Sequence, residues 1–179
     1  TTAAMQNIFS NLLNAYKRNE LETRTGLGMF ALSSTPTDLA EPSETLKTTV
    51  AWQMGIASPN YLLSTQQVDQ FRWHGKVEQE TDICGQRSAY LVNDSFAIEP
   101  DTVKEWSIVA EVEQDASQVA ALIHGLAETS DAVQADLHQD IEKGTADLIT
   151  IITKADGVQE SGDRLSTAHH FANVLFNVM

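Results

Sequence analysis

The sequence predicts an α+β fold in which an antiparallel, β-sandwich-like sheet is followed by a helical linker segment. Short stretches of β-forming residues, separated by turn-forming residues, fill the chain from Gly26 onward. One of them, Lys104–Glu113, shows the clearest alternation of period two. After Asp115 the apolar residues change to helical spacing. Because no strand alternates with a helix, the pattern favours an antiparallel sheet over a parallel one.

The chain opens with a helical pattern. Ile8, Leu12 and Tyr16 stand at i, i+4 and i+8, which places them on one helical face. We expect this first helix to end near Glu22.

The predicted strands follow this helix. In Lys104–Glu113, alternation predicts that one set of side chains faces the sheet core and that the other set is mostly solvated. The core-facing set is Trp106, Ile108, Ala110 and Val112. The other predicted strands are Leu27–Ser33, Leu46–Gln53, Val68–Trp73 and Ser88–Val92.

Three helices are predicted after the sheet. Asp115 can cap the first, whose apolar face is formed by Val119, Leu122, Ile123 and Leu126. Ser130 and Asp131 begin a longer helix, and Gly157 is its expected stop. The last helix begins near Asp163 or Arg164. We therefore divide the chain into residues 1–115, the first helix with the sandwich, and residues 116–179, the helical linker.

The last helix carries an apolar stripe that continues to the final residue. Its members are Leu165, Ala168, Ala172, Leu175 and Met179. We expect this stripe to pack on the preceding long helix or, in a homodimer, on a second copy of the chain. Because no stop signal follows it, we expect the parent protein to continue beyond Met179, and Thr1 as first residue suggests that it also begins earlier.

Composition limits the possible partners. The chain has 11 Lys+Arg and 25 Asp+Glu, a formal charge of −14 that argues against nucleic acid and anionic lipid. No apolar run approaches the roughly 20 residues that cross a bilayer, so we expect a soluble, cytoplasmic protein. The single cysteine, Cys84, cannot form an internal disulfide, and we expect a buried structural thiol.

One tract has the composition of a sugar platform. Trp73 offers a face for pyranose C–H groups, while Arg72 and His74 can bond hydroxyls, so these three residues are the substrate-binding candidates. The competing interpretation is that Trp73 packs in the protein, as we expect for Trp52 and Trp106.

The sequence provides no catalytic residue, metal ligand or cofactor motif that we assign. The adjacent His169 and His170 point about 100° apart on a helix, whereas helical metal ligands stand at i and i+4. We expect a structural or hydrogen-bonding role for this pair, with His169 the more buried.

Three segments stand out for a resemblance: LKTTVAWQ at Leu46–Gln53, ETDICGQRSAY at Glu80–Tyr90 and WSIVAEVEQD at Trp106–Asp115. They resemble parts of the cellobiose phosphorylase-like proteins, the glycoside hydrolase family 94 type whose relatives include cyclic β-1,2-glucan synthase. The Pro-containing turn at Glu99–Asp101 and the segment Asp163–Met179 are similar to the end of the family's β-supersandwich domain and the linker entering its (α/α)6 barrel.

The resemblance implies a galactose mutarotase-like sandwich fragment of an enzyme for phosphorolysis, hydrolysis or glycosyl transfer at β-linked glucosides. Inorganic phosphate would be a co-substrate of that parent, and its catalytic Asp would lie on the barrel. No catalytic residue is carried over to this chain, and the opening helix departs from the family pattern. The alternative function is an autonomous protein-interaction module with an amphipathic helical tail.

Overall fold

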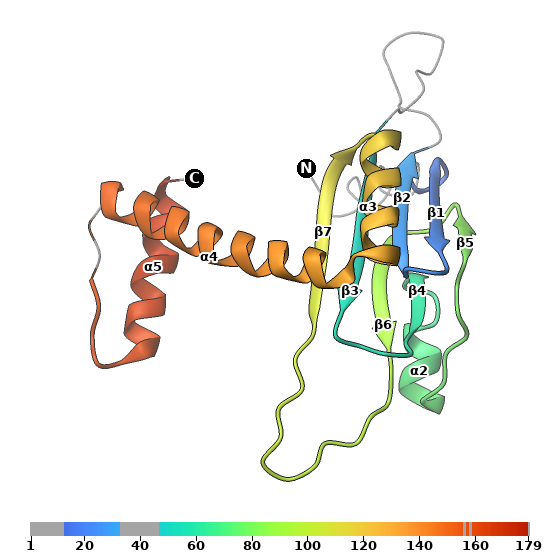
Figure 1. The fold of residues 1–179 in the computed structure, drawn as a ribbon, viewed down its shortest axis with the longest axis horizontal. Coiled ribbons are helices and arrows are strands. Elements are labelled where there is room, and N and C mark those ends of the chain that lie inside the picture. The colour runs from blue at the N-terminus through green and yellow to red at the C-terminus, as the bar shows by residue number, and fades with distance from the viewer. Residues whose placement is uncertain (1–12, 33–46, 156, 158, 179) are drawn as a thin grey trace, which may run out of the picture. The chain divides into compact units, whose positions relative to one another are not determined.

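The computed structural model describes residues 13–32, 47–155, 157 and 159–178 (Figure 1). The chain divides into two compact units, Thr1–Thr129 and Ser130–Met179, which we describe separately. The boundary between them lies after the first helix that follows the sheet.

The first unit is built on a five-stranded sheet in the order β5-β1-β2-β3-β7. Every neighbouring pair in this sheet is antiparallel. The predicted α+β class with an antiparallel sheet is therefore confirmed. The strands are Lys17–Glu22 (β1), Leu27–Leu32 (β2), Thr48–Met54 (β3), Asp82–Cys84 (β5) and Ser107–Gln114 (β7).

A second sheet of two antiparallel strands, Asn60–Ser64 (β4) and Ser88–Asn93 (β6), forms the other layer of a sandwich. The core between the layers is centred on Leu21 of β1 with Tyr61 and Leu63 of β4. Partly buried hydrophobic residues surround this cluster. They are Phe30, Ile83, Tyr90 and Val92.

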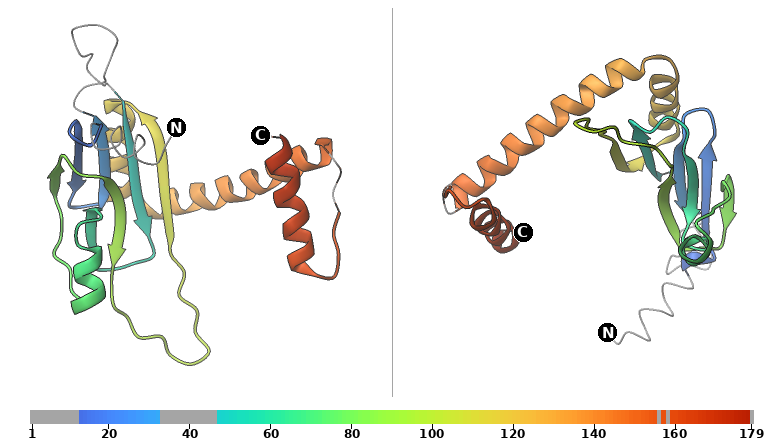
Figure 2. Two further views of the ribbon diagram at one scale, coloured as in Figure 1. Left: turned by 180° about the vertical axis from the view of Figure 1, so that it is seen from behind. Right: turned by 90° about the horizontal axis from the view of Figure 1, so that it is seen from below.

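Helix α3 (Ala116–Glu128) lies on the face of the large sheet opposite to β4 and β6 (Figure 2). On β3, Val50, Ala51 and Trp52 are all buried. Asp115 caps α3 as predicted, because its carboxylate accepts hydrogen bonds from the backbone of Ser117 and Gln118 and the Gln118 side chain bonds back to Asp115.

The segment predicted as a strand at Val68–Trp73 is instead helix α2, Val68–His74. Its residues Val68 and Phe71 are three positions apart, a helical spacing, and both line a small cleft against β4 and β6. Gly75 ends the helix at φ 65°, with its N–H bonded to the carbonyl of Phe71 at 2.7 Å.

The predicted helix up to Glu22 is wrong over Lys17–Glu22, which forms β1, and its first part lies outside the described residues. Burial on this strand alternates, with Asn19 and Leu21 buried and their neighbours less so. Cross-strand pairing with β2 determines the conformation, through a turn closed by the N–H of Gly26 bonded to the carbonyl of Glu22 at 2.9 Å.

The predicted strand at Lys104–Glu113 exists as β7, but the prediction of its core-facing side is wrong. Trp106, Ile108 and Val112 are 50%, 54% and 67% exposed, and Ala110 is exposed too. The partly buried side carries Val109, which pairs with Trp52 of β3. Alternation alone cannot say which face of an edge strand is covered, and here the small sheet does not cover β7.

The second unit is a pair of helices, α4 (Ser130–Ala155) and α5 (Arg164–Val178). Gly157 follows α4 at φ 79°, and its N–H bonds to the carbonyl of Ile152 at 3.1 Å, as expected of the predicted stop. Ile152 and Val174 are buried in this pair. None of the helices in the described ranges is long and apolar enough for a membrane span.

The stripe predicted to be covered on the last helix is mostly exposed. Leu165 is 81% exposed, Ala168 and Ala172 are exposed as well, and Leu175 is partly buried. Helix α5 packs on α4 through a neighbouring face that contains Val174. Met179 lies outside the described residues.

Candidate functional site

An apolar cleft opens between the two layers of the sandwich, next to β6. Its volume is about 410 Å³, and residues of β2, β3 and β6 form most of its wall. Lys17, Thr49, Ser88 and Tyr90 are the polar residues in its lining, and Lys17 is the charged one. The remaining lining residues are Phe30, Ala31, Leu32, Ala51 and Ala89.

Tyr90 joins this cleft to the core. Its ring meets Phe30 edge-on at 6.5 Å between centroids and lies 5.8 Å from the ring of Tyr61. Its hydroxyl donates a 2.7 Å hydrogen bond to the carbonyl of Gly26. Burial, with a smaller contribution from Tyr61, raises the pKa of Tyr90, so the phenol stays protonated and acts as a donor.

Gly26 is required at this position for two reasons. Its φ of 73° is left-handed, and a Cβ atom there would collide with the Tyr61 ring. A Cβ on Gly28 would likewise come within 2.9 Å of Cδ2 of Tyr90. The aromatic side of the cleft therefore depends on these two small residues.

Asn19 connects three strands behind the cleft. Its side chain is fully buried and donates to the carbonyl of Leu63 in β4 at 2.9 Å. Its Oδ1 accepts from the hydroxyl of Ser88 in β6 at 2.8 Å. Because both ends of the amide are satisfied, Asn19 fixes the small sheet against β1.

A buried carboxylate, Glu80, stabilises the same layer from the other end. It accepts hydrogen bonds from the backbone N–H groups of Leu63 at 2.6 Å and Ser64 at 2.9 Å, from the Ser64 hydroxyl at 3.1 Å and from Nε2 of Gln67 at 2.9 Å. In each of these hydrogen bonds the partner donates and the carboxylate accepts. This arrangement holds the end of β4 and the start of α2 in place.

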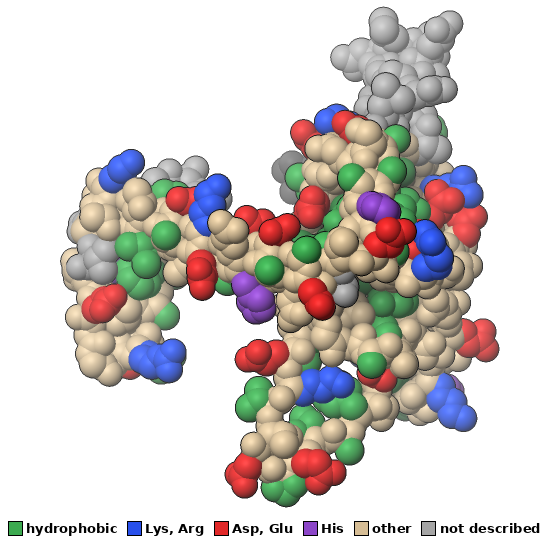
Figure 3. Space-filling model, in the orientation of Figure 1, with side chains coloured by type: hydrophobic (Ala, Val, Ile, Leu, Met, Phe, Trp, Pro, Cys, Tyr) green, Lys and Arg blue, Asp and Glu red, His purple; other side chains and the backbone are tan. Residues whose placement is uncertain are grey.

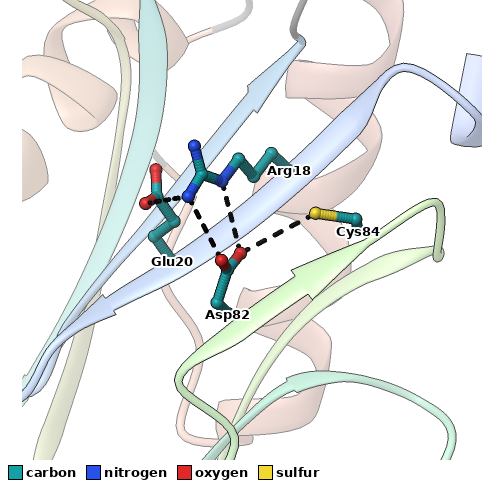
Figure 4. A network of polar contacts seen from close by, with 4 residues as sticks. All are labelled: Arg18, Glu20, Asp82 and Cys84. Atoms are coloured by element: carbon teal, nitrogen blue, oxygen red, sulfur yellow. Dashed lines mark hydrogen bonds and ion pairs between the residues drawn. The ribbon is translucent and has the colours of Figure 1, made fainter.

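A polar network crosses the surface where β5 pairs with β1 (Figure 4). Arg18 contacts both oxygens of Asp82, at 3.3 and 3.1 Å, and also Glu20 at 3.0 Å. The hydrogen bond from Arg18 lowers the pKa of Asp82. Cys84 lies 3.8 Å from Asp82 and is exposed, so the expectation of a buried thiol is wrong.

The sugar-platform candidates lie at the end of α2. Trp73 is 83% exposed and does not pack in a core, in contrast to the competing interpretation. Arg72 is exposed and pairs with Asp69 at 3.0 Å, and His74 is exposed as well. Consecutive helical positions point about 100° apart, so the three side chains do not converge on one point, and none lines the cleft beside β6.

The other two tryptophans divide between core and surface. Trp52 is 3% exposed, as predicted, but Trp106 is half exposed and meets Phe96 at 6.0 Å between ring centroids. Phe96 belongs to the loop between β6 and β7, which also carries exposed Ile98 and Val103; hydrophobic side chains are visible on this loop at the bottom of Figure 3.

The histidine pair has the opposite burial to the one predicted. His169 is exposed, whereas His170 is partly buried and its Nε2 lies 3.2 Å from the carbonyl of Gly157. Helix geometry places His170 with Val174, one turn later, on the covered face. Among the residues that the structure describes, no group of three or more His, Cys, Asp or Glu is arranged to hold a metal.

Sequence reasoning missed the residues that form the cleft. Ser88 and Tyr90 line the cleft, and strand pairing brings them to distant residues, Ser88 to Asn19 behind the cleft and Tyr90 to Gly26. The sequence feature that could have indicated this cleft is the pair Gly26 and Gly28. A segment with two glycines is too short to be a phosphate-binding loop, but here the glycines allow aromatic rings to approach the backbone closely. The lining of the cleft is mostly apolar, and its polar residues are Lys17, Thr49, Ser88 and Tyr90.

Comparison of the chain with protein-family models and with curated proteins gave no match.

Proposed function

We propose that this chain is a non-catalytic sandwich and linker part of a cytoplasmic carbohydrate-active enzyme, a phosphorylase or glycosyl transfer enzyme that acts on β-linked glucosides. The observation that supports this proposal is the order of the architecture. An antiparallel two-layer sheet is followed by α3 and then by long helices, which is the order that the resemblance implies. Inorganic phosphate and the catalytic groups belong to the parent enzyme in this proposal.

The candidate carbohydrate contact is Trp73. Its ring is the most exposed of the three tryptophans, and an exposed indole face can stack on the C–H groups of a pyranose. Arg72 and His74 lie beside it and carry hydrogen-bond donors for sugar hydroxyls. The contact would be shallow, so we expect weak affinity that depends mainly on the ring.

Titration with short β-1,2-, β-1,3- and β-1,4-linked gluco-oligosaccharides, followed by NMR, tests this proposal. We expect saturable, millimolar binding that Trp73→Ala abolishes. Trp106→Ala is the matched control, because Trp106 is also exposed but lies outside α2. The chain alone should neither hydrolyse nor phosphorolyse these sugars. Binding that is absent, or that is unchanged in Trp73→Ala, would refute the carbohydrate role.

The alternative function, a protein-interaction module, is favoured by the helical unit. Several large apolar side chains of α4 and α5 are exposed, among them Leu165 at 81% and Phe176 at 85%. Exposed apolar surface of this kind marks protein contacts, including a homodimer through the last helix. Sedimentation of the chain with Leu165→Lys and Phe176→Lys tests the alternative, which predicts that these changes abolish association.

A further inference from the structure

The inner face of the large sheet is covered over only part of its width. The core cluster lies between β4 and β1, and Phe30 of β2 and Tyr90 of β6 extend it. Strand pairing joins Leu21 of β1 to Gly28 of β2, Gly28 to Ala51 of β3, and Ala51 to Ala110 of β7. Because paired residues point to the same side of a sheet, Ala51 and Ala110 lie on the same face as Leu21. On β7 the same face includes Ile108 and Val112, which are exposed.

The small sheet ends at β6, directly beside this open face. Strand β6 pairs with β4 along one edge. Along its other edge, no backbone hydrogen bond is formed within the part of the chain that the structure describes. The cleft lined by Phe30, Thr49, Ala51 and Ala89 lies where a further strand of the small sheet would run.

We propose that this cleft receives an extended strand of a partner polypeptide, which pairs with the free edge of β6 and covers β3 and β7. Neighbouring strands are about 4.8 Å apart, so a strand added to β6 runs over the next strand of the facing sheet. Alternate apolar side chains of the guest would contact the exposed Ala110 and Ile108 of β7, beside Ala51, which is 5% exposed in the lining of the cleft. This inference does not depend on the carbohydrate role.

The free edge is what specifies a strand as the occupant. A row of unpaired N–H and C=O groups is completed by another extended backbone, whereas a helix or a small apolar molecule would leave these groups without partners. The core between the layers also continues into the cleft through Phe30 and Tyr90. The guest therefore extends an existing two-layer core.

The charge of the chain indicates which side chains the guest carries on its other face. With a formal charge of −14, the protein attracts a strand whose outward residues are Lys or Arg. We therefore expect the guest to alternate β-branched apolar residues with basic or neutral polar ones.

The test uses a capped peptide of alternating valine and threonine with lysine at both ends. NMR of the whole chain should show saturable binding, with slowed amide exchange at every second residue of β6 and shifts at Ile108 and Val112. Ile108→Lys should weaken binding at least tenfold, and its exposure leaves the fold intact. Val103→Lys, at an equally exposed loop position, should bind as the unchanged protein does.

Two control peptides make the result decisive without relying on any protein variant. One has the same composition with its valines in a block, and the other is N-methylated at alternate residues so that one backbone edge cannot donate. Both should bind at least tenfold more weakly than the alternating peptide. Equal binding of either control, absence of binding, or a concentration-dependent pairing of two chains through β6 would each overturn the proposal.

Discussion

The carboxylate of Glu80 accepts hydrogen bonds from both the backbone N–H of Ser64, at 2.9 Å, and its hydroxyl, at 3.1 Å. The two residues are far apart in sequence and both are buried. Together with the hydrogen bonds from the backbone N–H of Leu63 and from Nε2 of Gln67, these contacts fix the end of β4, so the small sheet depends on one carboxylate.

Replacing Glu80 tests that dependence. Glu80→Gln puts an amide NH2 among donors and should lower the free energy of unfolding by on the order of 1–3 kcal/mol, and Glu80→Ala should cost more because it leaves every donor without an acceptor. Urea unfolding measures both effects. Exposed Glu78→Gln is the control and should change stability by less than about 0.5 kcal/mol. Similar small effects at both positions would mean that the network is dispensable.

Trp52 and Trp106 should respond very differently to truncation. Trp52→Ala removes a buried ring and should cost about 3–5 kcal/mol, whereas Trp106→Ala, at a half-exposed site, should cost less than about 1 kcal/mol. Trp52→Phe should fall between them, since Nε1 of Trp52 is buried without a hydrogen-bond partner and its loss is no penalty. Equal costs for the two alanine variants would contradict the assignment of the buried face.

The protein should become less stable in acid because Asp115, which caps α3, becomes protonated. A hydrogen bond from the Ser117 hydroxyl, followed by the backbone N–H of Gln118, lowers the pKa of Asp115 below its ordinary 3.8. Because the pKa of Asp115 is lower in the folded protein than in the unfolded chain, its contribution to stability is complete above the unfolded-state pKa. This contribution is lost as the pH falls through the folded-state pKa.

Asp115→Asn isolates this effect, because asparagine keeps a cap acceptor but does not titrate. The difference in stability between the two proteins should be constant near neutral pH and should shift in favour of Asp115→Asn as the pH falls below about 4. Urea unfolding across this range, together with hydrogen exchange of α3, provides the measurement. A difference that stays constant down to the lowest pH would exclude titration of the cap.

The stability of the helical unit, α4 with α5, should depend on Ile152 and not on the predicted apolar stripe of α5 that includes Leu165. Ile152→Ala removes a side chain that is 2% exposed and should cost about 2–5 kcal/mol within this unit. Leu165→Ala, at 81% exposure, should cost less than about 0.5 kcal/mol. Hydrogen exchange of α4 and α5 reports the stability of this pair directly. A larger effect at Leu165 would indicate that the stripe is covered in solution, as a dimer requires.

Some elements were predictable because their determinants are local. The cap at Asp115, the long helix from Ser130 and the stop at Gly157 follow from residues within a few positions of each other. The strands β2, β3, β6 and β7 were found from β-forming stretches, within a few residues at their ends. The helix α2 was misassigned because a stretch of seven residues is too short for periodicity to decide.

The candidate site was not predictable in the same way. Tyr90 and Phe30 form one wall only because β6 lies across β2, and Asn19 becomes a buried anchor only when Leu63 and Ser88 reach it. The predicted platform at Trp73 remains a hypothesis that the oligosaccharide titration tests.

The sequence by itself therefore determined the fold class, the helix caps and stops, and the alternation of β7. The tertiary structure decided which side of each element is covered, because that depends on what lies across the sheet or helix and not on the element. Strand β7 has two sides that both contain apolar residues, and only the extent of the small sheet leaves Ile108 and Val112 open. On α5, likewise, the approach of α4 buries Val174 and leaves Leu165 in solvent.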